Sequence, residues 1–306
     1  MTRTATLVEV APRDGFQPIG PFIPTGDKVE FIRAAHAAGL RRIEIGSFVN
    51  PKAVPQLRDT GDVLRATADL PGFDPQILVP NARGVDLALA AGAKHLAYVI
   101  SASDAHNRNN VRRDTDVSIA EYGEMVRALP AGTRLRLNLA TSFDCPFDGR
   151  MDEDFVLDRL ARMLEHRADV EVGLCDTTGR ADPAHVASLV TRCLRRWTAG
   201  GTTFLFHGHD TYGLGLANIA AAWDAGLDRF DTAFAGLGGC PFAPGATGNT
   251  ATEDAVWMFR RMGVETGVHL DALIRLAVRA AAIPGAQPGG RVRAALTAAL
   301  TATCGA

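Results

Sequence analysis

The sequence has few cysteines, no long apolar run and no excess of charge of one sign. Its five cysteines contain no CxxC pair, and 32 basic against 34 acidic residues leave a formal net charge of −2. Scattered cysteines indicate neither a disulfide framework nor a zinc–thiolate site, which favours a reducing cytoplasm. A nearly neutral chain offers no general field for nucleic acid or for an acidic membrane surface. We therefore expect no nucleic-acid partner.

Sequence features of export and membrane insertion are also absent. Residues 1–6 lead into a strand-like run without the apolar stretch of a signal peptide, and no window approaches a spanning helix. The chain is instead 47% hydrophobic and 22% charged, which is apolar enough for a full core. We expect a soluble, cytoplasmic globular protein with no membrane partner.

Short apolar runs typical of buried strands alternate with Ala/Leu-rich segments typical of helices. Strands are expected at residues 7–10, 42–45, 76–79, 96–100, 135–139, 170–174, 203–206 and 229–233. About eight such units indicate an α/β fold, the (β/α)₈ TIM barrel, although a doubly wound open sheet is the alternative. We predict one barrel domain over 1–306, with 269–306 as a helical extension that caps the barrel or forms a subunit interface.

The most informative motif is His207-Gly208-His209-Asp210, which ends the apolar run 203–206. Side chains two apart on a strand share a face, so His207 and His209 can present two imidazoles to one divalent cation. Paired histidines also occur on surfaces and in hydrogen-bonded cores, so the motif alone is weak evidence of a metal site.

Further polar residues lie at or near the carboxyl ends of the expected strands. These ends converge on one mouth in a TIM barrel, so residues far apart in the sequence can surround one substrate. The residues concerned are Arg13, Asp14, Glu44, Asn81, Asp176, Cys240 and Asn249.

Six motifs spread over nearly the whole chain are specific in combination. They are VEVAPRDGFQ at 8–17, IEIGSFVNPK at 43–52, CPFDG at 145–149, HGHDTYG at 207–213, AGLGGCPFA at 235–243 and GNTATED at 248–254. With them the chain resembles the 3-hydroxy-3-methylglutaryl-CoA (HMG-CoA) lyase family, which belongs to a superfamily of metal-dependent barrel lyases and synthases. The Gly-Leu-Gly-Gly-Cys-Pro run favours the lyase branch.

The resemblance implies that Asp14, His207, His209 and Asn249 bind a divalent cation, with Mg²⁺ or Mn²⁺ expected. Carboxylate and amide oxygens suit hard cations, and two imidazoles extend acceptance to Co²⁺ or Zn²⁺. Such a cation would hold the tertiary hydroxyl of the substrate and a neighbouring oxygen, and it would lower the pKa of that hydroxyl.

The resemblance also implies cleavage of an HMG-CoA-like thioester to acetyl-CoA and acetoacetate, a reaction of leucine degradation, with CoA as part of the substrate. Arg13 is suited to stabilise the enolate. Asp176 is the candidate base, although a metal-bound water or Asp14 could serve instead. By resemblance Cys240 protonates the enolate, and Glu44 orients Arg13 or the substrate.

Contacts with the rest of the substrate are expected from Gln17 and Ser47, which lie in the same motifs. The loop at 18–22 reads PIGPF, where lyases of this family commonly carry a polar stretch with a lysine. This departure indicates that the substrate could carry a larger or less charged arm. The basic stretch at 107–113 and Lys52 could meet CoA phosphates, although basic loop residues are usually only solvated.

Each candidate residue also has a purely structural interpretation. Arg13 and Asp14 could form an ion pair at the barrel rim, and Glu44 could accept from a backbone amide. Asp176 and Asn249 could cap the helices that follow them.

Four functions remain open on the sequence alone. The first is the HMG-CoA lyase reaction, and the second is the same cleavage of a different 3-hydroxyacyl thioester or hydroxy acid. A Claisen-type condensing acyltransferase is the third, although synthases of the superfamily usually carry an extra regulatory region. The fourth is a non-catalytic ligand-binding barrel. We expect a small-molecule acyl thioester as the partner, and a homodimer or higher homo-oligomer.

Overall fold

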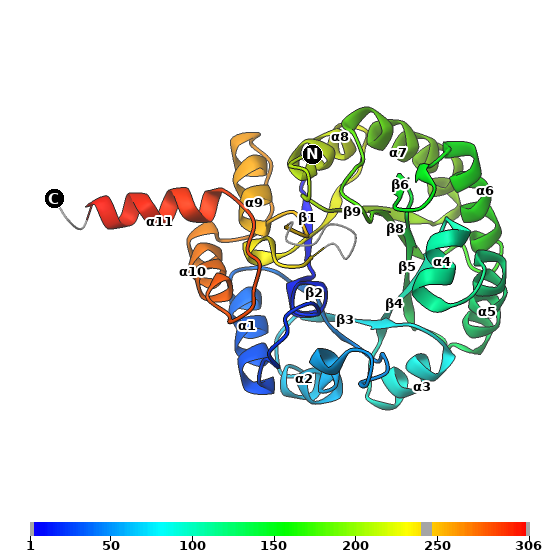
Figure 1. Ribbon diagram of the computed structural model, residues 1–306, viewed down its shortest axis with the longest axis horizontal. Coiled ribbons are helices and arrows are strands. Elements are labelled where there is room, and N and C mark those ends of the chain that lie inside the picture. The colour runs from blue at the N-terminus through cyan, green and yellow to red at the C-terminus, as the bar shows by residue number, and fades with distance from the viewer. Residues whose placement is uncertain (1–2, 240–246, 304–306) are drawn as a thin grey trace.

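Eight parallel strands close into a barrel in the order β1-β10-β9-β8-β5-β4-β3-β2 (Figure 1). The computed structural model describes residues 3–239 and 247–303, with only the backbone described for 299–303. The barrel strands are β1 (Thr6–Glu9), β2 (Arg42–Ser47), β3 (Asp74–Val79), β4 (His95–Ser101), β5 (Arg134–Ala140), β8 (Glu171–Asp176), β9 (Thr203–Gly208) and β10 (Arg229–Thr232). Each lies at a position expected from the sequence, so the TIM-barrel prediction is confirmed and the open-sheet alternative is wrong.

Helices surround the barrel (Figure 1). They are α1 (Thr25–Ala37), α2 (Thr60–Ala66), α3 (Ala82–Ala90), α4 (Asp104–Val111), α5 (Thr115–Ala128), α6 (Glu153–Leu164), α7 (Pro183–Trp197), α8 (Gly215–Asp224), α9 (Thr252–Arg261), α10 (Leu270–Ala281) and α11 (Val292–Thr303). In α7 the buried residues Val186, Leu189, Val190 and Cys193 recur at helical spacing, which gives one apolar face for the barrel. Among the described residues, no helix is long and apolar enough to span a membrane.

The barrel interior is polar where TIM barrels are usually filled by branched apolar side chains. Arg136 on β5 donates to Gln76 on β3 (3.3 Å) and to Asp231 on β10 (2.8 Å), and all three side chains are buried. These strands are not neighbours, so their side chains meet inside the barrel. The apolar core therefore lies mainly between the strands and the surrounding helices.

Additional C-terminal helices are present, as the sequence predicted. The loop before α11 is fixed to the barrel, because the Gly289 N–H donates to the Ala235 carbonyl at 2.8 Å and the Val292 N–H donates to Asp254 at 2.8 Å. From there α11 extends away from the barrel (Figure 1). Whether 1–306 acts as one domain with 269–306 as its extension stays a prediction.

Candidate metal centre

A short π-helical turn, η1 (Ala11–Gly15), follows β1 and carries Arg13 and Asp14. Glu9, the last residue of β1, holds this turn in place. Its Oε1 accepts from the Ala11 N–H at 2.8 Å and from the Phe234 N–H at 3.1 Å. Phe234 begins a 3₁₀ turn, η4 (Phe234–Gly236), after β10. One buried carboxylate therefore joins the loops that follow the first and the last strand of the barrel.

His207 lies near the end of β9, which runs between β8 and β10, and His209 directly follows that strand. Gly208 separates them, and a Cβ at this glycine would lie 2.4 Å from the Phe206 ring, so the outer face of the strand is filled. His207 and His209 face the opposite side, as their alternation on the strand predicted. Both are buried, with 9% and 7% of their surface exposed.

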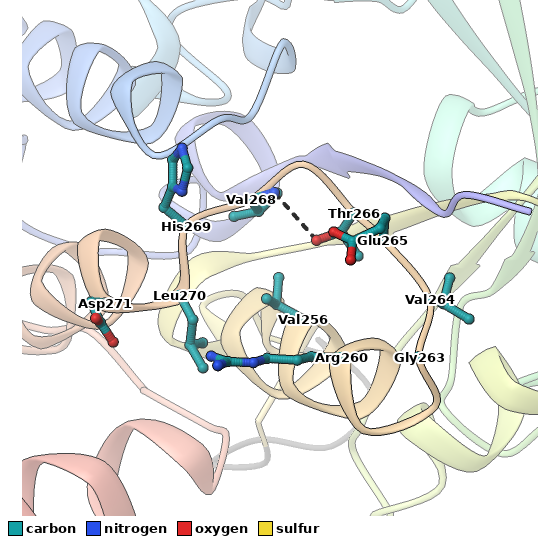
Figure 2. Close-up of a pocket in the computed structure, with 10 residues that line it drawn as sticks. All are labelled: Val256, Arg260, Gly263, Val264, Glu265, Thr266, Val268, His269, Leu270 and Asp271. Carbon is teal, nitrogen blue, oxygen red and sulfur yellow. Dashed lines mark hydrogen bonds between the residues drawn. The ribbon is translucent and has the colours of Figure 1, made fainter. Parts of the chain in front are cut away.

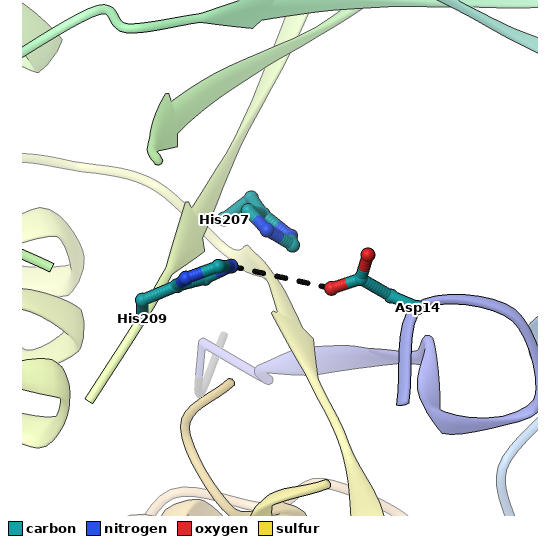
Figure 3. Close-up of side chains that lie close together, drawn as sticks. All are labelled: Asp14, His207 and His209. Atoms are coloured by element: carbon teal, nitrogen blue, oxygen red, sulfur yellow. Dashed lines mark ion pairs between the residues drawn. The ribbon is translucent and has the colours of Figure 1, made fainter. Parts of the chain in front are cut away.

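Asp14, His207 and His209 come together at the mouth of the barrel (Figure 3). One candidate ligand atom from each lies within 4.8 Å of the others, and the distance from His209 Nε2 to Asp14 Oδ2 is 4.0 Å. The Nδ1 atom of His209 is buried without a hydrogen-bond partner among the described residues. A carboxylate with two imidazoles is a donor set that suits a divalent cation, so these residues fit a metal centre.

The charges at this site favour the forms that bind a cation. Burial opposes ionisation of Asp14, but the Arg13 guanidinium and the two imidazoles hold the pKa of its carboxyl well below the usual range. Burial also lowers the pKa of His209 to about 4, so its ring is neutral near pH 7. An ionised carboxylate and a neutral imidazole are the ligand forms of these side chains.

Asn249 reaches the same site from the segment before α9. The backbone pairs Thr250 N–H with Gly208 O at 3.1 Å and Asp210 N–H with Gly248 O at 2.7 Å, which places residue 249 beside His209. The Asn249 amide donates to Asp14 Oδ2 at 2.7 Å.

The N-cap residue of α9 is Ala251, so the interpretation of Asn249 as a helix cap is wrong. That the amide oxygen of Asn249 binds the cation stays a prediction.

Arg13 is held by two carboxylates. Its Nε donates to Glu44 Oε2 and its Nη1 to Asp14 Oδ1, both at 2.5 Å. Glu44 is 1% exposed, and no described residue bonds its Oε1. Burial raises the pKa of Glu44 despite the neighbouring arginine. The Arg13–Asp14 ion pair is present, whereas the interpretation of Glu44 as a backbone partner is wrong because its bonded oxygen accepts from Arg13.

Ser47 points into the barrel because β2 contains a bulge. The register against β3 shifts between Glu44 and Gly46. A Cβ at Gly46 would lie 2.4 Å from the Thr60 Oγ1 of α2, so Gly46 faces outward and Ser47, the next residue, faces inward. The Ser47 Oγ is buried and unpaired among the described side chains. Gln17, the other predicted substrate contact, is exposed in the turn after η1.

The structure does not bring Asp176 to the metal centre. Cys175 pairs in register with His207, and a Cβ at Gly173 would lie 2.4 Å from Asn138 Oδ1 inside the barrel. Alternation along β8 therefore directs Asp176 outward. Both oxygens of its carboxylate accept from the Ala181 N–H at 3.2 Å, and burial raises its pKa to about 7.

Asp176 does not cap the following helix either. The cap of α7 is Asp182, whose carboxylate accepts from the His185 N–H at 2.9 Å. The helix-cap interpretation of Asp176 is therefore wrong, and Asn81, which also follows a strand, is an N-cap of α3 instead of a site residue.

Cys240 lies outside the described residues. The chain just before it approaches the metal centre, because Leu237 O accepts from the Asn249 amide at 3.0 Å. Gly238 has φ +132°, and a Cβ there would lie 2.6 Å from the Asn249 Nδ2. A glycine is needed at this position for the backbone to pass so close to Asn249.

The segment at 18–22 is apolar in sequence, and hydrogen bonds fix its backbone. The Gln56 amide donates to the carbonyls of Ile19 and Pro21, each at 2.9 Å. The Phe22 ring packs against Arg58, whose guanidinium carbon lies 3.7 Å from the ring centroid.

Two arginines of the basic stretch at 107–113 form ion pairs with nearby carboxylates. Arg108 pairs with Asp114, and Arg113 pairs with Glu121. Nothing in these contacts supports a role for these two arginines toward CoA phosphates.

Asp231, which contacts the His207 ring, and Arg136, which contacts Asp231, were not predicted as site residues. Asp231 Oδ2 lies 2.9 Å from His207 Nδ1, and Arg136 donates to both oxygens of Asp231. The sequence carried a signal for them, since Arg136 stands between two leucines and Asp231 follows a phenylalanine on strands whose alternate residues face inward. Their pairing across 95 residues depends on the closed barrel.

Two cavities among the described residues lie away from this site. One of about 330 Å³ is bounded by residues 256–271 and includes Arg260, Glu265 and His269 (Figure 2). The other, of about 430 Å³, lies at the amino ends of the strands, and Arg42 in its wall is paired with Glu171 at 2.7 Å. Neither cavity is lined by the three metal-site residues.

Comparison with known proteins gives consistent matches over most of the chain. The HMGL-like family model matches residues 4–279. An (R)-citramalyl-CoA lyase of Chloroflexus aurantiacus is 41% identical, covering 88% of this chain and 87% of that protein. A hydroxymethylglutaryl-CoA lyase of Bacillus subtilis is 39% identical, with 90% and 91% covered.

Solved structures agree with these sequence matches. A hydroxymethylglutaryl-CoA lyase of Pseudomonas aeruginosa superposes with a TM-score of 0.91 at 34% identity, covering 97% of this chain and 99% of that one. An HMG-CoA lyase of Acinetobacter baumannii, solved in complex with coenzyme A and 3-methylmalate, gives 0.88 at 38% identity with 94% of both chains covered.

Proposed function

Because the chain belongs to the HMGL-like family, we propose that it is a divalent-metal-dependent lyase that cleaves an HMG-CoA-like thioester to acetyl-CoA and acetoacetate. Membership of this family makes the protein an enzyme, a carbon–carbon lyase of CoA thioesters, so the non-catalytic barrel is wrong. The observation that carries the finer proposal is the meeting of Asp14, His207 and His209 beside Arg13 at the barrel mouth.

Asp14, His207 and His209 would hold the cation, with Asn249 supporting Asp14. When bound, a divalent cation would orient the tertiary hydroxyl of the substrate and make it more acidic. Mg²⁺ and Mn²⁺ are our candidates, because an aspartate oxygen suits hard cations and two imidazoles are compatible with Mn²⁺.

Arg13 is proposed to stabilise the enolate. Its Nε and Nη1 donate to Glu44 and Asp14, which fixes the guanidinium plane, and Nη2 is proposed to donate to a substrate oxygen. A guanidinium stays charged and presents donors in a fixed geometry, so it is suited to a developing oxyanion. Ser47, whose inward hydroxyl has no partner in the part of the chain that the structure describes, is proposed as a substrate contact.

The cleavage requires one base and one acid. A base removes the hydroxyl proton at C3, the C2–C3 bond breaks, and its electron pair forms the enolate of the acetyl thioester while C3 becomes a carbonyl carbon. The enolate carbon then takes a proton, for which Cys240 is our candidate. The geometry does not favour Asp176 as the proton acceptor, because its carboxylate faces outward and accepts from Ala181, so Asp14 and a metal-bound water stay candidates.

A second candidate substrate is (R)-citramalyl-CoA. The relative of that name is 41% identical to this chain, covering 88% of it. The cleavage chemistry is the same for both thioesters, and only the released oxo acid differs. Nothing observed favours the condensing acyltransferase.

CoA is proposed to enter as the thiol part of the substrate, which agrees with the CoA-bound structure of the Acinetobacter baumannii relative. A cytoplasmic location and assembly into a homodimer or higher homo-oligomer are further proposals. The names of the relatives include both mitochondrial and cytoplasmic enzymes, so they do not decide the location.

The test is incubation of the metal-loaded protein with HMG-CoA and, separately, with (R)-citramalyl-CoA. Mass spectrometry would detect acetyl-CoA together with acetoacetate from the first thioester, or with pyruvate from the second. Cleavage that disappears with a chelator and returns with Mn²⁺ would support the proposal. A protein that binds Mn²⁺ but cleaves neither thioester would contradict the substrate class.

A further inference from the structure

The two imidazoles of the metal centre have different environments. His207 Nδ1 lies 2.9 Å from Asp231 Oδ2, whereas the Nδ1 atom of His209 is buried with no partner among the described residues. The contact of His207 is itself buried, because Asp231 is 2% exposed. A carboxylate therefore orients the ring of His207, whereas no described residue does so for Nδ1 of His209.

Asp231 is in turn held by a buried arginine. Arg136 is 1% exposed and donates through Nη1 to Asp231 Oδ1 at 2.8 Å and through Nη2 to Asp231 Oδ2. Its Nε donates to Asn138 Oδ1 at 2.6 Å, and its Nη1 also approaches Gln76 Oε1 at 3.3 Å. A guanidinium with partners on three edges has one orientation, and it keeps Asp231 ionised.

The ionised carboxylate decides which nitrogen of His207 carries the proton. A carboxylate accepts hydrogen bonds and donates none, so the neutral imidazole must place its N–H at Nδ1. Nε2 then carries the lone pair on the side of the ring away from Asp231. This is the tautomer that leaves Nε2 free as a metal ligand.

We propose that Asp231, held by Arg136, is a positioning residue that fixes the tautomer and the ring orientation of His207 for cation binding. The proposal rests on the proposed function only in taking His207 as a metal ligand. It makes the site asymmetric, because among the described residues a carboxylate bonds Nδ1 of His207 and none bonds Nδ1 of His209. Removal of a carboxylate that orients a ligating histidine typically lowers metal affinity about 10- to 100-fold.

The chain offers a matched control for this carboxylate. Asp74 Oδ1 lies 3.0 Å from His95 Nδ1, which gives a second aspartate–histidine pair. Both residues lie near the amino ends of their strands, at the opposite end of the barrel from the metal centre. Asp231→Asn and Asp74→Asn make the same chemical change behind two different histidines.

The experiment measures Mn²⁺ binding to the whole protein by calorimetry for the wild type and both variants, with thermal unfolding as the check of folding. We expect about 10- to 100-fold weaker binding for Asp231→Asn and unchanged binding for Asp74→Asn. A folded Asp231→Asn variant with wild-type affinity would overturn the positioning role. Wild-type protein that binds no Mn²⁺ would instead overturn the proposed metal-dependent function.

A measurement on the unaltered protein covers the case in which Asp231→Asn does not fold. Long-range ¹H–¹⁵N NMR of histidine-labelled, metal-free protein reports which ring nitrogen carries the proton, and the His207 signals are assigned by their loss in His207→Gln. We expect the Nδ1–H tautomer for His207. The Nε2–H tautomer would overturn the proposal, because Asp231 would then not be accepting from that ring.

Discussion

Arg13 bonds both Asp14 of the metal centre and the buried Glu44. A substitution at Arg13 can show whether this side chain stabilises the transition state or only binds the substrate. Lysine keeps the charge at this position but cannot bond Glu44 and Asp14 and still present a fixed donor to the substrate. We expect Arg13→Lys to lower kcat by about 100-fold or more with little change in KM, as for loss of an oxyanion donor.

Steady-state kinetics with the better of the two thioesters would measure this effect. Arg33→Lys is the matched control, since Arg33 pairs with Asp69 on the exposed surface and should leave both constants unchanged. An increase confined to KM would make Arg13 a substrate anchor instead.

Removal of the Ser47 hydroxyl should lower kcat/KM without lowering the melting temperature. Its buried hydroxyl has no partner among the described residues, so Ser47→Ala should leave the melting temperature unchanged or raise it. The same change should lower kcat/KM by about 10-fold, the value of one hydrogen bond of about 1.4 kcal/mol.

The control for Ser47 is Ser118→Ala. The Ser118 hydroxyl accepts from the Asn107 amide at 2.7 Å, so its loss should lower the melting temperature and leave kcat/KM unchanged. Equal kcat/KM for Ser47→Ala and the wild type would show that the Ser47 hydroxyl does not contact the substrate.

Residue identities in the sequence predicted the three metal-site side chains but not all of their neighbours. The spacing of His207 and His209 sufficed because alternation on a strand is local. Asp176 was expected at the barrel mouth, but the sequence does not say which face of β8 points inward. In the structure Cys175 points inward, beside His207, and Asp176 points outward. The Asp231–Arg136 pair could not be predicted as a pair, since its two strands meet only in the closed barrel.

At the scale of elements, irregular backbone places the functional side chains. The bulge in β2 turns Ser47 inward, and the π-helical turn after β1 carries Arg13 and Asp14. Both irregularities depend on contacts with distant segments, such as the close approach of Gly15 to Leu237, where an added Cβ would lie 2.9 Å from the leucine Cβ. The periodicity of the sequence predicted the strands and helices but not these deviations from them.

The close passage of the backbone at Gly238 predicts a sensitive position in the loop after β10. An alanine there would be strained at φ +132° and would place its Cβ 2.6 Å from the Asn249 Nδ2, displacing the amide that donates to Asp14. We expect Gly238→Ala to weaken Mn²⁺ binding and lower kcat by about 10-fold or more, as for loss of a residue that orients a ligand.

Gly263→Ala is the control for the backbone effect, because Gly263 also has positive φ, +72°, but no atom of the described residues lies within 4 Å of an added Cβ. It should lower the melting temperature slightly and leave Mn²⁺ binding unchanged, since αL alanine is strained by about 1 kcal/mol. Calorimetric affinities that are equal for the two variants would show that Gly238 matters only for its backbone conformation.

At the scale of the whole molecule, the sequence predicted the barrel because eight buried strands alternate with helices. Buried carboxyl groups could not be read in the same way, because such a group is recognised only from its surroundings. Glu9 is the clearest case. It is 0% exposed, and it accepts from Ala11 and Phe234 and from the Thr252 hydroxyl, which joins η1, η4 and α9.

Burial raises the pKa of Glu9 from 4.5 to about 8, which couples the stability of the barrel to pH. Between these values the folded protein holds a proton that the unfolded chain has released, so stability falls as pH rises and levels off above about pH 8. The slope for one such group is at most about 1.4 kcal/mol per pH unit. Glu9→Gln removes this dependence because the amide does not titrate.

Thermal unfolding in chelator between pH 6.5 and 8 isolates this effect. His209, whose pKa burial lowers to about 4, acts in the opposite direction but only below pH 6.5. Asp176 and Glu253, with pKa values raised to about 7 by burial, act in the same direction as Glu9 in both proteins. We expect the melting temperature of the wild type to fall more steeply across this window than that of Glu9→Gln. Parallel curves would show that Glu9 is ionised in the folded barrel, and that Ala11, Phe234 and Thr252 stabilise its charge fully.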